Sequence, residues 1–247
     1  MRYFIEFSYN GKNYHGWQKQ PNAVSVQEVL EQKLTTLLRT EIEVVGAGRT
    51  DSGVHARQMF AHFDFSQNIG NQFVNKLNSF LPKDIAVYKI HRVTDEAHAR
   101  FDALKRTYEY HILTQKDVFL NETAMYVNLP LDISKMEEAL SVLFKYTDFQ
   151  CFSKSNTDVH TYNCSIYEAF WKVQKGHIVF TISADRFLRN MVRAIVGTLL
   201  NVGLEKISIT DFEGVIKSKN RSQAGASVPA CGLFLVKVEY PEHIFLD

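Results

Sequence analysis

Alternating apolar and polar residues open the chain and predict a first strand. Residues 2–9 place Tyr3, Ile5, Phe7 and Tyr9 on one face, which is typical of a strand rather than of a signal peptide. A helix is expected at 25–39, opened by a Ser and a Glu with the spacing of a capping box. The other elements predicted in the first half are strands near 42–48, 57–65 and 84–93 and a helix near 70–80.

The second half repeats a similar order of elements. A helix near 134–146 begins with Ser134 and Glu137, again at capping-box spacing. The segment 217–230 is rich in Ser, Gly, Ala and Lys and is expected to be a mobile loop. The other predicted elements are strands near 105–114, 165–173, 177–184 and 232–240, a helix at 187–203 and a short helix from Thr210.

Both halves therefore follow approximately the order β-α-β-β-α-β, with the short helix from Thr210 as an addition in the second half. This order predicts an α+β fold of two similar halves, residues 1–104 and 105–247. The halves are expected to form a largely antiparallel sheet that carries its helices on one face. The two halves show no convincing sequence repeat, so the similarity lies in the order of elements.

Composition adds few constraints on function. Hydrophobic residues make up 45% of the 247 residues and charged residues 22%, as in ordinary globular proteins. No apolar run is long enough to cross a bilayer, so we expect no membrane association. Lys and Arg number 28 against 27 Asp and Glu, and a net charge of +1 does not indicate a nucleic-acid-binding protein.

The three cysteines are odd in number and widely spaced, which favours a reducing cytoplasm over a disulfide framework. Cys151, His160 and Cys164 fall within fourteen residues and could be read as zinc ligands. They lack a C-x2-C pair and a clear fourth ligand, so we expect no metal and favour buried thiols.

A short polar segment, 46–56, lies between two predicted strands and contains Asp51 among three glycines. Residues at strand ends often carry function. By itself this pattern favours a tight turn in which the aspartate satisfies nearby amides. A phosphate-binding loop is a weaker reading, because the Lys-Ser/Thr ending of a P-loop is missing.

The full string Gly48-Arg-Thr-Asp-Ser-Gly-Val-His-Ala56 resembles the signature of the tRNA pseudouridine synthase A (TruA) family, G-R-T-D-x-G-V-H-A. Further segments resemble motifs of the same family in the same order: Gly16-Trp-Gln-x-Gln-Pro21, His98-Ala-Arg-Phe101 with Lys105-Arg-Thr-Tyr-Glu-Tyr110, Asn190-Met-Val-Arg-x-Ile-Val-Gly197, and Pro229-Ala-x-Gly-Leu-x-Leu235. The resemblance covers nearly the whole chain. Each motif alone is weak evidence for the family, but five motifs in the same order are specific evidence for it.

The resemblance implies an isomerase that converts uridine to pseudouridine at positions 38, 39 and 40 of the tRNA anticodon stem-loop. It makes Asp51 the nucleophile, which attacks either the base or C1′ of the target uridine. It also implies a cytoplasmic homodimer without cofactors, and an active-site cleft between the halves.

The resemblance assigns Arg193 as the ion-pair partner that keeps Asp51 charged. On the predicted helix, Arg186, Arg189 and Arg193 fall within about 60° of one another. The pattern alone is equally typical of an amphipathic helix that exposes a basic edge to solvent. With Arg193 assigned to Asp51, the other two are expected to contact RNA phosphates.

Tyr108 is expected, from the resemblance, to stack on the target base near its C5 proton, whereas Tyr110 on the same strand face is expected to be core. Arg49 is expected to fill the gap left by the flipped base or to bind its phosphate. From the resemblance, Leu233 and Leu235 are expected to line the uracil pocket. The alternative is that both are ordinary core residues of a strand.

Two other functions stay open. One is a synthase with a different RNA site, and the other is a catalytically silent RNA-binding relative. The intact set of Asp51, Tyr108 and Arg193 argues against silence, because a carboxylate repels the phosphates that a pure binder would seek. The family often has a basic residue where Tyr162-Asn-Cys164 stands, so one phosphate contact is expected to be missing or relocated.

Overall fold

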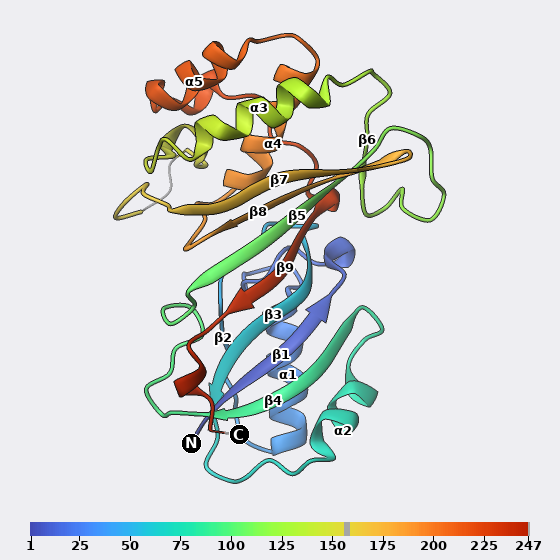
Figure 1. Cartoon of the computed structure of the whole chain (residues 1–247). Coiled ribbons are helices and arrows are strands. Elements are labelled where there is room, and N and C mark those ends of the chain that lie inside the picture. The colour runs from blue at the N-terminus through green and yellow to red at the C-terminus, as the bar shows by residue number, and fades with distance from the viewer. Residues whose placement is uncertain (156–158, 247) are drawn as a thin grey trace. The chain divides into compact units, whose positions relative to one another are not determined.

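The computed structural model describes residues 1–155 and 159–246, and the chain divides into two compact units (Figure 1). Unit 1 comprises Met1–Lys105 together with Phe234–Asp247, and unit 2 comprises Arg106–Leu233. The final strand, from Phe234 on, therefore belongs to unit 1, although it comes at the end of the half that we expected at 105–247. Helices and largely antiparallel strand pairs make up both units, which confirms the α+β class.

The strands of unit 1 are ordered β4-β1-β3-β9. Strand β1 pairs antiparallel with both β3 and β4, and β3 pairs in parallel with the start of β9. The elements of this unit are β1 (Arg2–Tyr9), α1 (Val26–Leu38), β2 (Val45–Gly46), β3 (His55–Asp64), α2 (Phe73–Phe80), β4 (Ile85–Val93) and β9 (Leu233–Glu239), of which β9 enters the unit at Phe234.

The core of unit 1 covers both faces of β1. Tyr3, Ile5 and Phe7 are buried, as the alternation predicted, and Phe7 lies against the ring of Trp17. Phe4 points to the opposite face and is also fully buried, among aromatic rings that include Tyr240. A central strand buried on both faces explains why Phe4 and Ile5 are adjacent apolar residues.

Unit 2 has the strand order β5-β8-β7, and β8 pairs antiparallel with both neighbours. Its helices gather on one side of these strands (Figure 1). No helix among the described residues is long and apolar enough to cross a membrane. The elements are β5 (Lys105–Leu113), β6 (Met125–Tyr126), α3 (Ile133–Leu143), β7 (Ile166–Gln174), β8 (His177–Ala184), α4 (Met191–Gly203) and α5 (Ile209–Ser218).

Two helix starts in unit 2 differ from the prediction. Helix α3 is capped by Asp132, whose side chain accepts from the Lys135 amide, so the expected box of Ser134 and Glu137 is wrong. Helix α4 begins at Met191 rather than at 187, because Asn190 has a left-handed backbone with φ 68°. A helix cannot run through a left-handed residue, so the chain turns before α4 starts.

The segment 217–230 is not the loose loop that its composition suggested. Gly225 donates its amide to the Thr198 hydroxyl at 2.9 Å, and Val228 donates to the Arg193 carbonyl at 3.3 Å. A β-carbon on Gly197 would lie 1.9 Å from the Ala226 carbonyl oxygen, so the two backbones touch. The small residues that suggested mobility instead allow close packing on α4.

Candidate active site

Asp51 lies in the loop between β2 and β3 of unit 1, as predicted, and is half-buried. The loop leaves β2 where the Ala47 amide donates to the Phe60 carbonyl, and it closes where the Val54 amide donates to the Asp51 carbonyl at 3.1 Å. Gly53 takes φ 81°, which a glycine adopts without strain. The tight turn expected from the three glycines is therefore present.

A second segment, residues 11–17, runs antiparallel beside this loop and is called the clamp segment below. It meets the loop at its start, middle and end. The contacts are Gly11 N to His55 Nδ1 at 3.0 Å, Gly53 N and Ser52 Oγ to the Tyr14 carbonyl, each at 3.3 Å, and Trp17 N to the Thr50 carbonyl at 3.3 Å. Both sides of Asp51 are thus fixed by backbone contacts from another part of the chain.

Gly16 shows how closely the clamp segment approaches. Its φ is 87°, and a β-carbon there would lie 2.4 Å from the Thr50 carbonyl oxygen and 3.1 Å from the Asp51 carbonyl carbon. A side chain at this position would therefore push directly against the peptide of Asp51. The Asp51 loop can therefore take this position only beside a residue without a side chain, which links the Gly16-Trp17 motif to the Asp51 motif.

Two further neighbours of Asp51 have defined surroundings. The Thr50 hydroxyl hydrogen-bonds the Tyr9 hydroxyl at 2.9 Å, and Tyr9 is buried at the end of β1. The sequence pattern placed Tyr9 on one face of the first strand and gave no sign of this bond. Arg49 is exposed, which leaves its side chain accessible to a ligand.

Strand β9 begins beside the end of the Asp51 loop. Ala56 pairs with Leu235, and the ring of His55 stacks on Phe234 with a centroid distance of 4.6 Å. Leu233 and Leu235 are both buried, with 7% and 2% of their surface exposed. That burial is equally expected of core residues, so their contact with a uracil stays a prediction.

Arg193 lies in the first turn of α4 in unit 2, and its side chain is half-buried. Its Nε donates to the Val228 carbonyl at 2.7 Å, while the Val228 amide donates to the Arg193 carbonyl. These reciprocal bonds fix the direction of the guanidinium. The segment expected to be mobile is therefore what holds this arginine.

Arg186 and Arg189 precede α4 and do not share a helix face with Arg193, so the helical-wheel grouping is wrong. Arg186 follows Asp185, whose carboxylate accepts from the Arg186 amide at 2.7 Å. Arg189 is exposed, and its carbonyl accepts from the Lys154 amide. Their placement before the helix follows from the left-handed Asn190 described above.

Tyr108 and Tyr110 share a face of β5 but have different surroundings. Tyr108 is half-buried and its ring meets Phe187 edge-on, with centroids 5.1 Å apart. Tyr110 is fully buried and its hydroxyl donates to the Pro229 carbonyl at 2.9 Å. Burial raises the pKa of Tyr110 above its ordinary value, so this phenol stays protonated. The core interpretation of Tyr110 is confirmed.

Arg221 was not singled out from the sequence, yet it organises the segment beside α4. Its guanidinium donates to the Ser227 hydroxyl at 2.8 Å and to the Gly225 carbonyl at 3.2 Å. The Asn190 side chain donates to the same hydroxyl at 2.7 Å. No spacing pattern indicates this network, because its members meet only through the tertiary fold.

The thiols considered as metal ligands do not gather around a site. Cys151 and Cys164 are buried, and this burial raises the pKa of each thiol to about 12. In the metal-free chain such groups remain neutral thiols. Within residues 1–155 and 159–246, no three His, Cys, Asp or Glu side chains are placed to hold a metal ion.

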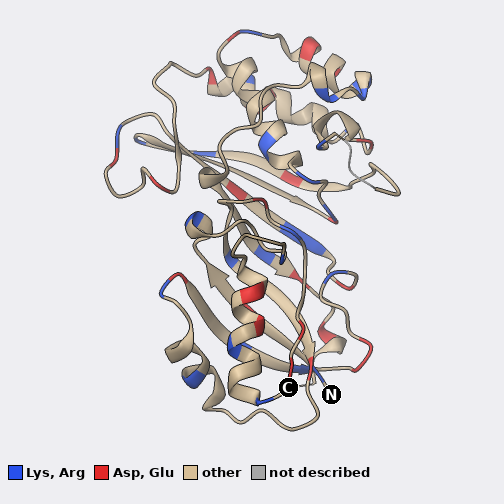
Figure 2. Ribbon diagram, turned by 180° about the vertical axis from the view of Figure 1, so that it is seen from behind, with Lys and Arg blue, Asp and Glu red and all other residues tan. Residues whose placement is uncertain are grey.

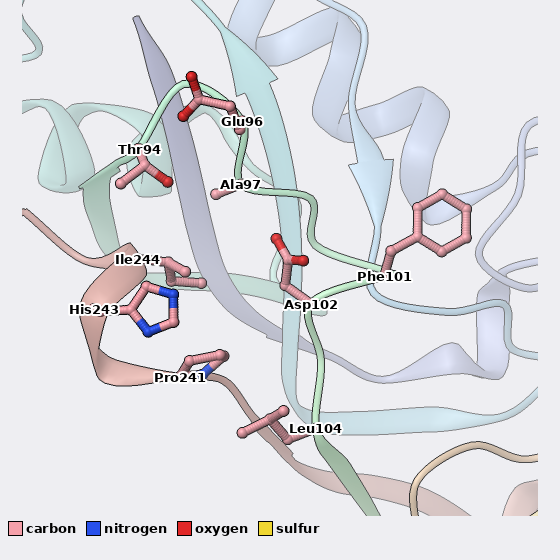
Figure 3. A pocket seen from close by; sticks show the side chains of 9 residues that line it. All are labelled: Thr94, Glu96, Ala97, Phe101, Asp102, Leu104, Pro241, His243 and Ile244. Atoms are coloured by element: carbon pink, nitrogen blue, oxygen red, sulfur yellow. The ribbon is translucent and has the colours of Figure 1, made fainter.

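A cavity of about 420 Å³ lies elsewhere in unit 1, between the segment after β4 and the segment after β9 (Figure 3). Its lining includes the carboxylates of Glu96 and Asp102 beside apolar residues such as Ile244. It lies toward the Asp64 end of β3, about 30 Å along the strand from the Asp51 loop at 3.3 Å per residue. Its carboxylates make it unsuitable for a phosphate, so we do not assign it to the candidate active site.

Charges of both signs are interspersed over the ribbon of each unit (Figure 2). This distribution agrees with the net charge of +1. A net charge this close to zero gives a polyanion little general attraction, so any binding of a polyanion must depend on local groups of cations.

A family model described as tRNA pseudouridine synthase matches residues 6–102 and 146–241. The chain belongs to this family. tRNA pseudouridine synthases are isomerases, so the predicted class of enzyme is confirmed. The matched ranges contain Asp51 and Arg193, while Tyr108 falls between them.

Relatives named tRNA pseudouridine synthase A match along nearly their full lengths. The protein from Parabacteroides distasonis is 57% identical over 247 residues, covering 99% of this chain and 98% of the relative. The one from Bacteroides fragilis is 54% identical over 248 residues, with the same coverage. A more distant relative, from Thermoanaerobacter pseudethanolicus, is 39% identical over 239 residues, covering 96% of this chain and 98% of the relative.

Proposed function

We propose that this synthase isomerises uridine to pseudouridine at positions 38, 39 and 40 of the tRNA anticodon stem-loop, with Asp51 as the nucleophile. The observation that carries the proposal is the half-buried Asp51, which lies in the family signature and whose neighbours in the chain on both sides are held by the clamp segment. A carboxylate on a loop held in this way is suited to covalent catalysis, because it is both a nucleophile and a competent leaving group.

The reaction conserves every atom of the substrate. Asp51 attacks either the base or C1′, and the bond between N1 and C1′ breaks. The uracil then turns over. If Asp51 attacked C1′, C5 of the turned uracil bonds to C1′ and displaces the carboxylate; if Asp51 attacked the base, the carboxylate is expelled after C5 has bonded to C1′. C5 then loses its proton, N1 gains one, and Asp51 is regenerated as a carboxylate. The step needs no oxidant, reductant or cofactor.

Arg193 is proposed to pair with Asp51 and keep it ionised when the enclosed base excludes water. Its fixed Nε bond to Val228 supports this role, because a guanidinium with a set direction loses less entropy on pairing. Tyr108 is proposed to stack on the uracil near its C5 proton. Its edge contact with Phe187 supports this role by fixing the plane of its ring.

The other assigned residues are proposed to bind the substrate. Arg49 would occupy the gap left by the flipped uridine or bind its phosphate, and its exposure supports either role. Arg186 and Arg189 would contact phosphates from the irregular segment before α4. Leu233 and Leu235 would form apolar walls of the uracil pocket.

The resemblance also leads us to propose a cytoplasmic homodimer. A subunit with a net charge of +1 offers few surplus cations to a tRNA, and a symmetric pair would double them. Sedimentation combined with activity measurements tests this proposal, and a fully active monomer would refute it.

Pseudouridine mapping of tRNAs incubated with the protein tests the function. The expected result is new pseudouridine confined to positions 38, 39 and 40. Pseudouridine at another position would indicate a synthase of different specificity. Bound tRNA without any pseudouridine would indicate a silent RNA-binding relative.

A further inference from the structure

Asp84 lies just before β4, and its side chain and backbone meet the start of the clamp segment. Its Oδ1 accepts from the Tyr14 hydroxyl at 2.5 Å, and its Oδ2 accepts from the Asn13 side chain at 3.1 Å. Its carbonyl accepts from the Asn10 amide at 2.9 Å. One residue therefore holds the clamp segment at Asn13 and Tyr14, and also holds Asn10, which directly precedes the segment.

Tyr14 links this attachment to the loop. Its side chain is held by Asp84, while its carbonyl accepts from Gly53 N and Ser52 Oγ. Only 5% of Tyr14 is exposed, and burial together with the Asp84 carboxylate raises the pKa of this phenol above its ordinary value. The hydroxyl thus stays protonated and donates a charge-assisted hydrogen bond, which is stronger than a neutral one.

We propose that Tyr14 and Asp84 are positioning residues that hold the Asp51 loop in its reactive geometry. The proposal rests on the proposed role of Asp51 as nucleophile. Neither residue would touch the substrate, because each would act through the Tyr14 carbonyl and the two loop residues that it binds.

The geometry predicts a particular kinetic effect. Without the bond between Tyr14 and Asp84, the Tyr14 backbone can shift and the loop can shift with it. A shift of about 1 Å in a reacting group can lower a rate by about 100-fold. The affinity for tRNA comes largely from phosphate contacts elsewhere, so it should change little. The expected result is a fall in the single-turnover rate of pseudouridine formation with the Kd for tRNA nearly unchanged.

Tyr14→Phe removes the hydroxyl and keeps the ring, and Asp84→Ala removes the acceptor. Tyr3→Phe is the matched control, because Tyr3 is also buried, with 4% exposed, and its hydroxyl donates to the Gln67 carbonyl at 3.0 Å. Tyr3 lies near the opposite end of β1, where it pairs with Phe63. The assay is single-turnover pseudouridine formation at saturating tRNA, with the tRNA Kd measured in parallel on folded protein.

We expect Tyr14→Phe and Asp84→Ala each to slow the reaction by about 10- to 100-fold, with Kd within about threefold of wild type. The double variant should be no slower than the slower single variant, because both remove the same bond. Asp84→Asn, which keeps an acceptor oxygen, should recover part of the rate, and Tyr3→Phe should match wild type. Rates within about twofold of wild type in both single variants would overturn the proposal.

Amide hydrogen exchange separates this proposal from the proposed function. In the absence of RNA, Tyr14→Phe should speed exchange in the peptide spanning residues 50–55, and Tyr3→Phe should not. If the wild-type protein makes no pseudouridine, the proposed function fails whatever the exchange shows. If wild type is active and Asp51→Asn is inactive, but Tyr14→Phe keeps the wild-type rate or the wild-type exchange, only the positioning role fails.

Discussion

Gly16→Ala tests how strictly the clamp segment fixes Asp51. Gly16 has φ 87°, and the new methyl group would lie 2.4 Å from the Thr50 carbonyl oxygen. Holding an alanine in the left-handed region costs about 1–2 kcal/mol. Relieving the overlap costs about 1–3 kcal/mol more. We expect Tm to fall by about 5–15 °C in a chain of this size.

The effect on activity follows from where the methyl group pushes. To reach an ordinary contact of about 3.4 Å, the Thr50 carbonyl must retreat by about 1 Å, and it belongs to the peptide that leads directly into Asp51. We therefore expect the rate of pseudouridine formation to fall by about 100-fold in protein that remains folded. The assay is single-turnover pseudouridine formation well below the lowered Tm.

Gly214→Ala is the control for this substitution. Gly214 lies in α5, it is exposed, and nothing lies within 4 Å of a β-carbon built there. Replacing a glycine inside a helix by alanine should raise the free energy of unfolding by about 0.5–1 kcal/mol and leave activity unchanged. The reasoning about the clamp segment would be refuted if Gly16→Ala kept its unfolding free energy within about 0.5 kcal/mol and its rate within about twofold.

Two other predictions concern stability. Gly197→Ala would place a methyl group 1.9 Å from the Ala226 carbonyl oxygen, so urea unfolding should show a loss of at least about 2 kcal/mol; an unchanged midpoint would contradict the close packing on α4. Burial, with the nearby charges of His98 and Arg2, lowers the pKa of His62 to about 4. The unfolded chain binds a proton at His62 near pH 6.5, so stability should fall as pH drops from about 6.5 toward about 4, by at most about 1.4 kcal/mol per pH unit from this group. Urea titrations should show a shallower fall in His62→Gln, and equal slopes would count against this cause.

The sequence predicted elements best where one local pattern determined them. Alternation places β1 at Arg2–Tyr9, and the hairpin of β7 and β8 turns at Gly176, where φ is 76°. The start of α4 was missed because Arg186 and Arg189 continue a helical pattern that a single left-handed Asn190 interrupts. An asparagine is among the few residues that adopt this conformation, but its presence alone does not require it.

The candidate site was predicted through resemblance rather than through local physics. The pattern around Asp51 favours only a tight turn, and the structure contains that turn. The contacts that hold Asp51, from Gly16 and Tyr14, join positions more than thirty residues away along the chain. Likewise, the small residues of 217–230 suggested mobility, while their packing on α4 depends on Gly197. Such pairings depend on tertiary contacts that no short window of sequence contains.

Asp51→Asn tests the central claim most directly. The amide keeps the size and shape of the side chain and removes its nucleophilic charge. Wild-type protein and the variant are incubated with the same tRNA, and pseudouridine and bound tRNA are both measured. We expect the variant to form no pseudouridine while its tRNA affinity remains close to wild type. Pseudouridine formation by the variant at the wild-type rate would contradict the role of Asp51 as nucleophile.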